Sequence, residues 1–269
     1  MDYQIARVDN TLDYIRYKDA KLIDNLVGMV LPQFRNKIYI DIGPCDDPNL
    51  YLRRIFNGNQ TIFIDNSDYA ASCWEQWNHE SFTFVKETVT PHNVVDLINE
   101  VYESRGIEKN TDPQFFDLDI DGYDAEVLEA LLKKMTPTVI CAEINEKIPP
   151  PIKFTVKYSP DYKWAGDHFY GMSISKFYEV VVKYGYSVIF LNGNTIYATY
   201  GERMEPRAAI HASDSEIYNR YYRKPRLDGD LDSFDFNKDV DCLLNMNYED
   251  SIEKIKYLFF KYAGKYEIS

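Results

Sequence analysis

Short runs of β-branched and aromatic residues alternate with longer stretches of helical periodicity along most of the chain. The spacing predicts helices over 91–106, 125–135 and 173–186, and a further helix over 11–31 that stops at Pro32. This alternation of strand and helix predicts a mainly parallel sheet covered by helices on both faces. The runs that predict its strands are KIYIDIG (37–43), QTIFIDN (60–66), FTFVKETVT (82–90), FFDLDID (115–121) and TVICAEIN (138–145).

The pattern ends in a hairpin, because two apolar β runs within 187–200 flank Asn192-Gly193-Asn194. We therefore expect residues 37–200 to form one Rossmann-like α/β domain that is preceded by a helical segment at 1–36. Residues 201–269 contain an acidic loop and then a helical stretch rich in Leu, Phe and Tyr. We expect them to pack on the main domain as a C-terminal extension.

Composition narrows the class of protein. The net charge of −13 disfavours nucleic-acid binding, which needs clustered Lys and Arg. The four cysteines form no CxxC pair, which disfavours a zinc site and favours the reducing cytoplasm. No apolar run approaches the roughly 18 residues of a membrane span, and the first residues show no secretory signal. We expect a cytoplasmic protein with no membrane partner.

The stretch FFDLDIDGYDAEVLEALL, from Phe115 to Leu132, concentrates four aspartates in eight residues. Its D-x-D-x-D-G opening is also that of an EF-hand calcium loop, but position 12, which should be a bidentate Glu, is Leu128. As a strand of an α/β sheet, the run would point Asp117, Asp119 and Asp121 the same way, with the last two at or just beyond the strand end. Ligands bind at the carboxyl ends of such strands.

The acids of this stretch fall into two pairs, one with an ordinary structural explanation and one without. Asp124 and Glu126 fall in the first turn of the predicted helix, where capping or solvated acids are common. Asp119 and Asp121 are harder to explain by structure alone, because two close carboxylates repel unless a cation, a proton or a cationic ligand compensates. They are therefore candidate site residues.

A second candidate region follows the first predicted strand. Asp65 ends the second strand about 20 residues after Gly43, the spacing at which a glycine turn and an acid bind a nucleoside. The full G-x-G-x-x-G is absent. Asp41, Asp46 and Asp47 surround the turn and would repel a pyrophosphate, whereas they suit the ammonium and sulfonium of S-adenosylmethionine. Charge thus favours that cofactor over NAD.

The segments IDIG, FIDN, VTPHNV, FFDLDIDGYDAEVLEALL, VICAEIN and YGMSISKF…YGYSVIFLNGNTIYAT resemble class I S-adenosylmethionine-dependent methyltransferases, and within them the FkbM-like branch. Members of that branch often methylate hydroxyls of sugars and natural products. The resemblance covers roughly 37–200 and is weakest at the glycine loop. It implies a seven-strand sheet whose final strand is antiparallel.

The resemblance also implies roles for individual residues. It implies cofactor contacts at Asp41 and Gly43, with Asp65 on the ribose, and it places Asp119 and Asp121 near the transferable methyl. Related sugar O-methyltransferases hold Mg²⁺ with carboxylates at the ends of strands four and five. Asp119, Glu143 and Asn145 would be the ligands of such an ion in this chain, although their spacing departs from a clean D-D pair.

Methylation of a hydroxyl requires a base that removes its proton. His168 is our preferred base, because its ordinary pKa of about 6.5 suits proton abstraction near neutrality; the alternative is an exposed loop histidine. Asp121 and Glu143 are the other catalytic candidates, and Glu143 could instead bind the metal. Tyr158 and Tyr170 are candidates for the acceptor pocket. We interpret His79, His92 and His211 as surface residues, and Trp74 and Trp77 as packing residues.

No N-P-P-Y-type segment follows the fourth strand, which disfavours the common arrangement for methylating amino groups of DNA bases or glutamine. The hypothesis is therefore an O-methyltransferase acting on a sugar, a glycan precursor or another small hydroxylated metabolite, with Mg²⁺ and homo-oligomerisation left open. The alternatives are a non-catalytic methyltransferase-like protein, an NAD-linked oxidoreductase and a divalent-cation binding module.

Overall fold

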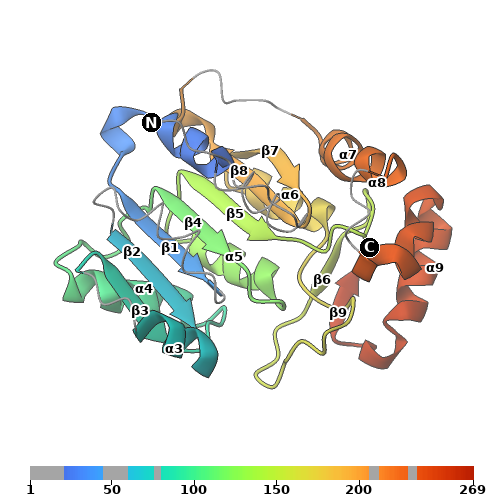
Figure 1. The fold of residues 1–269 in the computed structure, drawn as a ribbon, viewed down its shortest axis with the longest axis horizontal. Helices are drawn as coiled ribbons and strands as arrows, with labels where there is room; N and C mark the ends of the chain where they lie inside the picture. The colour runs from blue at the N-terminus through green and yellow to red at the C-terminus, as the bar shows by residue number, and fades with distance from the viewer. Residues whose placement is uncertain (1–20, 45–59, 76–79, 206–211, 230–234) are drawn as a thin grey trace, which may run out of the picture.

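A seven-stranded sheet forms the centre of the molecule (Figure 1). The structure, a computed structural model, describes residues 21–44, 60–75, 80–205, 212–229 and 235–269. The strand order is β3-β2-β1-β4-β5-β8-β7, and only β8 runs antiparallel to its neighbours, so the predicted sheet and its closing hairpin are confirmed. The strands are β1 (Ile38–Ile42), β2 (Gln60–Asp65), β3 (Phe82–Lys86), β4 (Phe115–Leu118), β5 (Val139–Glu143), β7 (Tyr186–Asn192) and β8 (Thr195–Tyr200).

Both faces of the sheet are buried, as expected for parallel strands with alternating side chains. One face packs Ile40, Phe116 and their neighbours against helices α4, α5 and α6. The opposite face packs Tyr39 and Phe115 against residues 21–28, which are helical, and further along the sheet it packs Phe63 against α3. The helices are α3 (Asp68–Glu75), α4 (Val94–Ser104), α5 (Asp124–Leu132) and α6 (Ile174–Lys183).

Two predicted boundaries need correction. The strand predicted at 115–121 ends at Leu118, because the backbone turns there and Asp121 takes a left-handed conformation with φ of 54°. Asp119 and Asp121 therefore lie on a loop and not on the strand. The strand predicted at 82–90 ends at Lys86, before the turn that leads into α4. Of the helix predicted at 11–31, residues 21–28 are helical and residues 11–20 lie outside the described part.

The C-terminal residues share a core with the segment that follows β5. Strand β6 (Phe154–Val156) pairs antiparallel with β9 (Tyr266–Ile268) in a second, two-stranded sheet. Phe154 and Phe169 pack with Val240, Ile255 and Phe259. The remaining elements are α7 (Asp214–Tyr218), the π-helix η4 (Asn219–Arg223), α8 (Lys224–Leu227), α9 (Tyr248–Leu258) and the 3₁₀ helices η1 (Pro32–Phe34), η2 (Gly201–Arg203), η5 (Asp235–Asn245) and η6 (Phe260–Tyr262).

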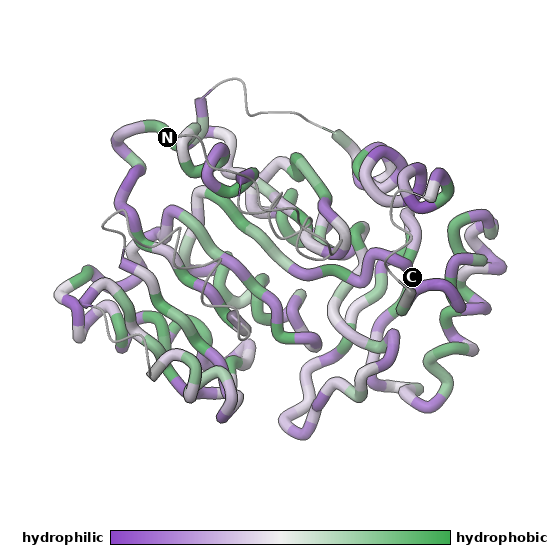
Figure 2. The backbone as a smooth tube through the Cα atoms, in the orientation of Figure 1, coloured by the Kyte–Doolittle hydropathy of each residue, from purple (hydrophilic) through white to green (hydrophobic). Residues whose placement is uncertain are grey.

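The distribution of hydrophobic residues follows these layers. Figure 2 shows them gathered along the central strands, whereas α9 alternates hydrophobic and hydrophilic positions along its length. In the described ranges, no helix combines the length and the apolar character that crossing a bilayer requires.

Candidate active site

The loops after β1 and β4 touch at the place where the strand order reverses. Asp119 donates its backbone N–H to the Ile42 carbonyl at 2.9 Å. Gly43 has φ of +79°, and a Cβ built on it would lie 1.6 Å from the Asp119 carbonyl oxygen. Only glycine fits, because both the conformation and the space exclude a side chain. This contact is the topological switch point, outside which α/β sheets bind their ligands.

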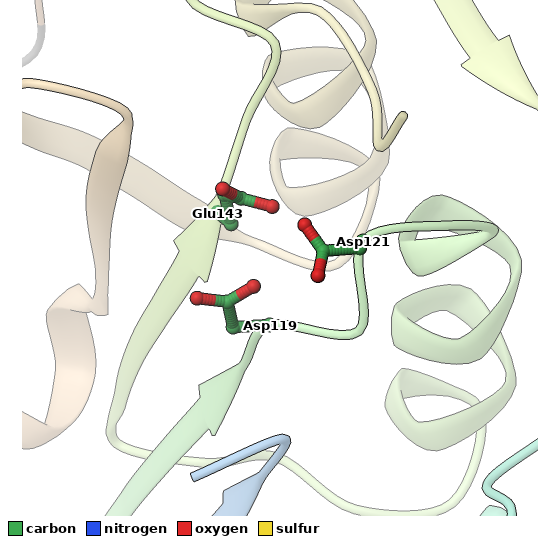
Figure 3. A group of neighbouring side chains, drawn as sticks. All are labelled: Asp119, Asp121 and Glu143. Atoms are coloured by element: carbon green, nitrogen blue, oxygen red, sulfur yellow. The ribbon is translucent and has the colours of Figure 1, made fainter. Parts of the chain in front are cut away.

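Three carboxylates converge beside this contact. Asp119 and Asp121 come from the loop after β4, and Glu143 is the last residue of β5 (Figure 3). One carboxylate oxygen from each lies within 4.8 Å of the others. Asp119 is exposed, whereas Glu143 is almost fully buried. The sequence predicted carboxylates at these two strand ends, and the structure brings them together.

The loop that carries Asp121 is held from two sides. The buried Asp124 carboxylate accepts hydrogen bonds from the backbone N–H of Ile120 at 3.1 Å and of Gly122 at 2.9 Å. The Tyr162 hydroxyl lies 2.9 Å from the Asp121 carbonyl oxygen. Asp124 is thus a buried residue that caps backbone N–H groups of the turn, so of the two interpretations, capping or solvated, the solvated one is wrong. Glu126 accepts a hydrogen bond from the backbone N–H of Tyr158.

Glu143 is fixed by the hairpin at the end of the sheet. Asn194, in the turn between β7 and β8, donates its side-chain amide to Glu143 Oε1 at 2.6 Å, and its carbonyl accepts from Ile144. Glu143 Oε2 is buried and has no hydrogen-bond partner among the described residues. A buried carboxylate oxygen without a donor is costly, so the described part of the chain leaves this site incomplete.

Burial and mutual repulsion alter the acidity of these groups. Desolvation, followed by the charges of Asp121, Asp124 and Asp117, raises the pKa of Asp119 well above its usual range. The Asp119 side chain still reaches solvent, and repulsion by the neighbouring carboxylates contributes to the rise of its pKa. Burial and then the charge of Asp119 raise the pKa of Glu143 well above its usual range, and burial raises that of Asp121. No Lys or Arg in the described ranges forms an ion pair with these three.

The residues predicted for the cofactor lie on the other side of the Gly43 contact. Asp41 is buried in β1, directly opposite Asp117 of β4 in register. Asp65 ends β2 and accepts a hydrogen bond from the Ser67 backbone N–H at 2.7 Å. The Gly43 N–H donates to the Ile64 carbonyl, so the loop after β1 is also tied to β2. Asp46 and Asp47 lie outside the described residues.

His168 and Asn145 meet on the far side of Glu143. The Asn145 side-chain amide donates to the carbonyl oxygens of His168 at 2.8 Å and Tyr170 at 3.0 Å, so it holds this segment beside the end of β5. His168 Nε2 lies 3.0 Å from a carboxylate oxygen of Asp239, in η5. The His168 side chain is only 14% exposed, and its interpretation as an exposed loop histidine is wrong.

A buried polar network lies next to this segment, and the sequence did not predict it. Lys147 Nζ donates to the Tyr170 hydroxyl at 2.5 Å, which donates to Glu146 Oε2 at 3.1 Å. Asn237 donates to Glu146 Oε1 at 2.5 Å and lies 3.1 Å from the Tyr222 hydroxyl. Burial lowers the pKa of Lys147, while Glu146 opposes that shift. We call these five residues the lysine network.

The structure places the other candidate residues away from the three carboxylates, in packing contacts or at the surface. Tyr158 packs edge-to-face on Tyr123, with ring centroids 4.8 Å apart, and on the exposed His92 at 5.2 Å. Trp74 is buried and stacks on Phe63 at 4.0 Å, so its interpretation as a packing residue is confirmed. Trp77, His79 and His211 lie outside the described residues. Leu128, at the decisive EF-hand position, is buried in α5 and can ligate nothing.

No family model matches the chain, and no curated protein matches its sequence. Among solved structures, it is similar to magnesium protoporphyrin IX methyltransferase from Synechocystis, at 11% identity and a TM-score of 0.41 over 73% of this chain and 86% of that one. A Listeria monocytogenes protein described as an S-adenosylmethionine-dependent methyltransferase aligns at 10% identity and a TM-score of 0.43, over 69% and 96%.

The N-methyltransferase NodS of Bradyrhizobium japonicum, in complex with S-adenosyl-l-homocysteine, aligns at 8% identity and a TM-score of 0.41, over 71% of this chain and 87% of that one. All three TM-scores lie below 0.5, so the function proposed below rests on the geometry of this chain.

Proposed function

We propose that the chain is an S-adenosylmethionine-dependent O-methyltransferase that acts on a hydroxyl of a sugar, a glycan precursor or another small hydroxylated metabolite. The observation that carries the proposal is the uncompensated carboxylate group of Asp119, Asp121 and Glu143 beside the Gly43 contact. A cationic ligand at the switch point would supply the missing charge. The resemblance of residues 115–145 to the FkbM-like branch supports a sugar hydroxyl as the acceptor.

The residues present fit this cofactor. Gly43 lets the loops after β1 and β4 meet at the switch point, and Asp65 stands at the end of β2, where an acid accepts from ribose hydroxyls. The carboxylates of Asp119 and Asp121 suit an ammonium or a sulfonium and would repel a pyrophosphate, which favours this cofactor over NAD. When bound, S-adenosylmethionine supplies a methyl group that is already activated for transfer.

In methyl transfer, the protein itself must place the acceptor hydroxyl and remove its proton. The acceptor oxygen must be held within about 3–3.5 Å of the methyl carbon, in line with the bond that breaks. Asp121 and Glu143 are suited to take the hydroxyl proton, because a raised pKa makes a carboxylate a better base near neutrality. His168 is the other candidate base, with its Nε2 oriented by Asp239.

The same carboxylates could hold Mg²⁺. Oxygen ligands of this charge and spacing are those that hard divalent cations prefer. We therefore propose Asp119, Asp121 and Glu143 as the ligand set. Asn145, which the sequence suggested as a ligand, commits its amide nitrogen to the His168–Tyr170 segment. Its Oδ1, the atom that would bind an ion, is buried without a hydrogen-bond partner among the described residues. The chemistry that such an ion would supply is polarisation of the acceptor hydroxyl.

The test is transfer of labelled methyl from S-adenosylmethionine to a panel of sugars and nucleotide sugars, with Mg²⁺ and with EDTA. We expect turnover that Asp121→Asn reduces by at least 100-fold, whereas Asp161→Asn, an exposed acid on the loop that carries Tyr162, leaves it unchanged. His168→Gln separates the two candidate bases. Cofactor binding without turnover of any acceptor would support the non-catalytic alternative.

A further inference from the structure

A hollow of about 240 Å³ lies away from the carboxylates, between the loop after β5 and the C-terminal helices. Residues 149–152, which include three consecutive prolines, form one wall. The others are the α7–η4 segment, the end of η5 and the first turns of α9. We call this hollow the proline cleft. Its volume corresponds to roughly eight water molecules at about 30 Å³ each.

One cation of the proline cleft has no counter-charge. Arg223 donates from Nε to the Leu244 carbonyl at 2.6 Å and from Nη2 to the Asn245 side chain at 3.0 Å. Both acceptors are neutral, and Arg223 forms no ion pair in the part of the chain that the structure describes. This contrasts with the next arginine along the chain, because Arg226 is buried against Asp241 with two contacts of 2.9 Å. The guanidinium of Arg223 therefore keeps donors and charge for another partner.

Two hydroxyls of the proline cleft are also unsatisfied. Tyr218 and Ser251 both line it, are 2% and 1% exposed, and have hydroxyl oxygens without a hydrogen-bond partner among the described residues. Buried hydroxyls are almost always paired, and each exception in a native fold needs a reason. Two exceptions on the wall of one hollow, beside an uncompensated arginine, point to an absent ligand.

The remaining charges around the proline cleft do not supply that partner. Glu146 and Asp241 act on Tyr218 electrostatically, but Glu146 accepts from Asn237 and Tyr170, and Asp241 is paired with Arg226. The 11-residue helix α9 begins at the cleft with Tyr248, and its amino end adds partial positive charge. Glu249 and Asp250 in its first turn are exposed to solvent.

The geometry points to the proline cleft as a binding site for a small ligand that carries one carboxylate or phosphate group. The anionic group pairs with Arg223 at the amino end of α9, and the hydroxyls of Tyr218 and Ser251 hydrogen-bond to its oxygens after a small adjustment of their side chains. The prolines and Leu243 provide an apolar wall for a short carbon skeleton.

The position of the cleft allows a ligand bound there to influence the carboxylate group through the connecting loop. Pro149 follows Lys147 by two residues, and the loop that it begins is fixed where Ser173 donates its hydroxyl to the Ile152 carbonyl at 2.7 Å. A ligand in the proline cleft therefore restrains the loop that leads from Glu143 through the lysine network. Anion binding in the proline cleft is independent of the proposed methyl transfer.

The test is thermal unfolding of the full chain in inorganic phosphate and in acetate, each raised at constant ionic strength against chloride. We expect a saturable rise in Tm of several degrees with at least one anion. A response to phosphate alone identifies a phosphate site, and a response to acetate alone identifies a carboxylate site. No saturable response to either anion overturns the proposal.

Variants locate the response. Arg223→Gln should abolish it, whereas Arg220→Gln, an exposed arginine of the same π-helix that does not line the cleft, should keep it. Tyr218→Phe and Ser251→Ala remove hydroxyls that have no hydrogen-bond partner among the described residues, so both should fold as well as the wild type. Each should weaken the apparent anion affinity at least fivefold. Wild-type affinity in both hydroxyl variants, or in a folded Arg223→Gln, overturns the proposal.

Discussion

Two groups of polar side chains lie near the end of β5, and they differ in how their charges are balanced. The carboxylate group of Asp119, Asp121 and Glu143 has like charges and an unpartnered oxygen. The lysine network sets Lys147 against Glu146 and connects both to neutral hydroxyl and amide groups. The charges of the network are balanced within it, although Asn237 Oδ1 is buried without a hydrogen-bond partner among the described residues. The bond from Asn237 to Glu146 ties the C-terminal residues to the loop after β5. The carboxylate group has no counter-charge among the described residues.

This contrast distinguishes buried polar residues that stabilise the fold from polar residues that are kept for a function. Where buried charges are paired and hydrogen-bonded, a structural role alone explains why the chain keeps those residues. A cluster of acids that raise one another's pKa destabilises the fold and persists only where it has another use. We therefore expect mutations that neutralise an acid in the two groups to have opposite effects on stability.

The largest expected effect comes from the contact that brackets the carboxylate group. Gly43→Ala places a Cβ against the Asp119 carbonyl and forces a left-handed conformation on alanine. We expect a loss of about 4 kcal/mol in the free energy of unfolding, from strain and overpacking combined. Urea unfolding measures it. Gly28→Ala is the control, because no described atom beyond its own helix lies within 4 Å of the added Cβ, and it should cost nothing.

Neutralising an acid of the lysine network should also destabilise the fold. Glu146→Gln leaves Lys147 buried without its counter-ion, and we expect a loss of about 3 kcal/mol. Removing Lys147 as well, in Lys147→Met with Glu146→Gln, should recover part of that loss. Chemical unfolding of the single and double variants decides the point, and additive losses would contradict the account of the network.

The pH dependence of stability should report the acids beside the carboxylate group. Burial raises the pKa of Asp124 from 3.8 to about 6, so between these values the folded state binds more protons than the unfolded state. The stability that this proton provides is present below about pH 4 and is lost as pH rises through 6. The loss amounts to roughly 3 kcal/mol.

Comparing wild type with Asp124→Asn at pH 4.5, 6 and 8 isolates this contribution. The variant loses one of two backbone hydrogen bonds at every pH, but its stability should fall less than that of the wild type between pH 4.5 and 8. Parallel profiles of the two proteins would contradict a raised pKa at Asp124.

The smallest effect on stability has the opposite sign. Glu143→Gln removes a buried charge and lets the new amide donate to Asp119 or Asp121, so we expect a gain of about 2 kcal/mol in the free protein. The same variant should lose any stabilisation by Mg²⁺. Glu129→Gln, in a surface pair with Lys183, is the control and should change stability by no more than about 1 kcal/mol. Loss of stability in Glu143→Gln would show that the carboxylate group is internally balanced.

The sequence was informative where local pattern determines structure. The strands, the Asn192-Gly193-Asn194 hairpin and the acids at the ends of β4 and β5 could be predicted from short runs, because strand periodicity and turn residues act locally. The contact of Gly43 with Asp119 could not be predicted, because it depends on how β1 and β4 are placed in register. The left-handed conformation of Asp121 could not be predicted either, because an Asp-Gly pair does not show which of its two residues takes the positive φ.

The unpredicted parts of the site join residues that are distant in sequence. Glu146 meets Asn237 across 91 positions and His168 meets Asp239 across 71. The three-residue strands β6 and β9 are too short to carry a recognisable period. The only local signal for the lysine network was an acid next to a lysine before three prolines, which also describes an ordinary surface loop.

The most direct test of the central claim is calorimetric titration of the protein with S-adenosylhomocysteine and, separately, with reduced nicotinamide dinucleotide. We expect saturable 1:1 binding of S-adenosylhomocysteine and no binding of the dinucleotide. Gly43→Ala should abolish the binding of S-adenosylhomocysteine in a sample that remains folded at low temperature. Binding of the dinucleotide alone, or of neither ligand to a well-folded wild type, would contradict the assignment of this edge of the sheet as a methyltransferase site.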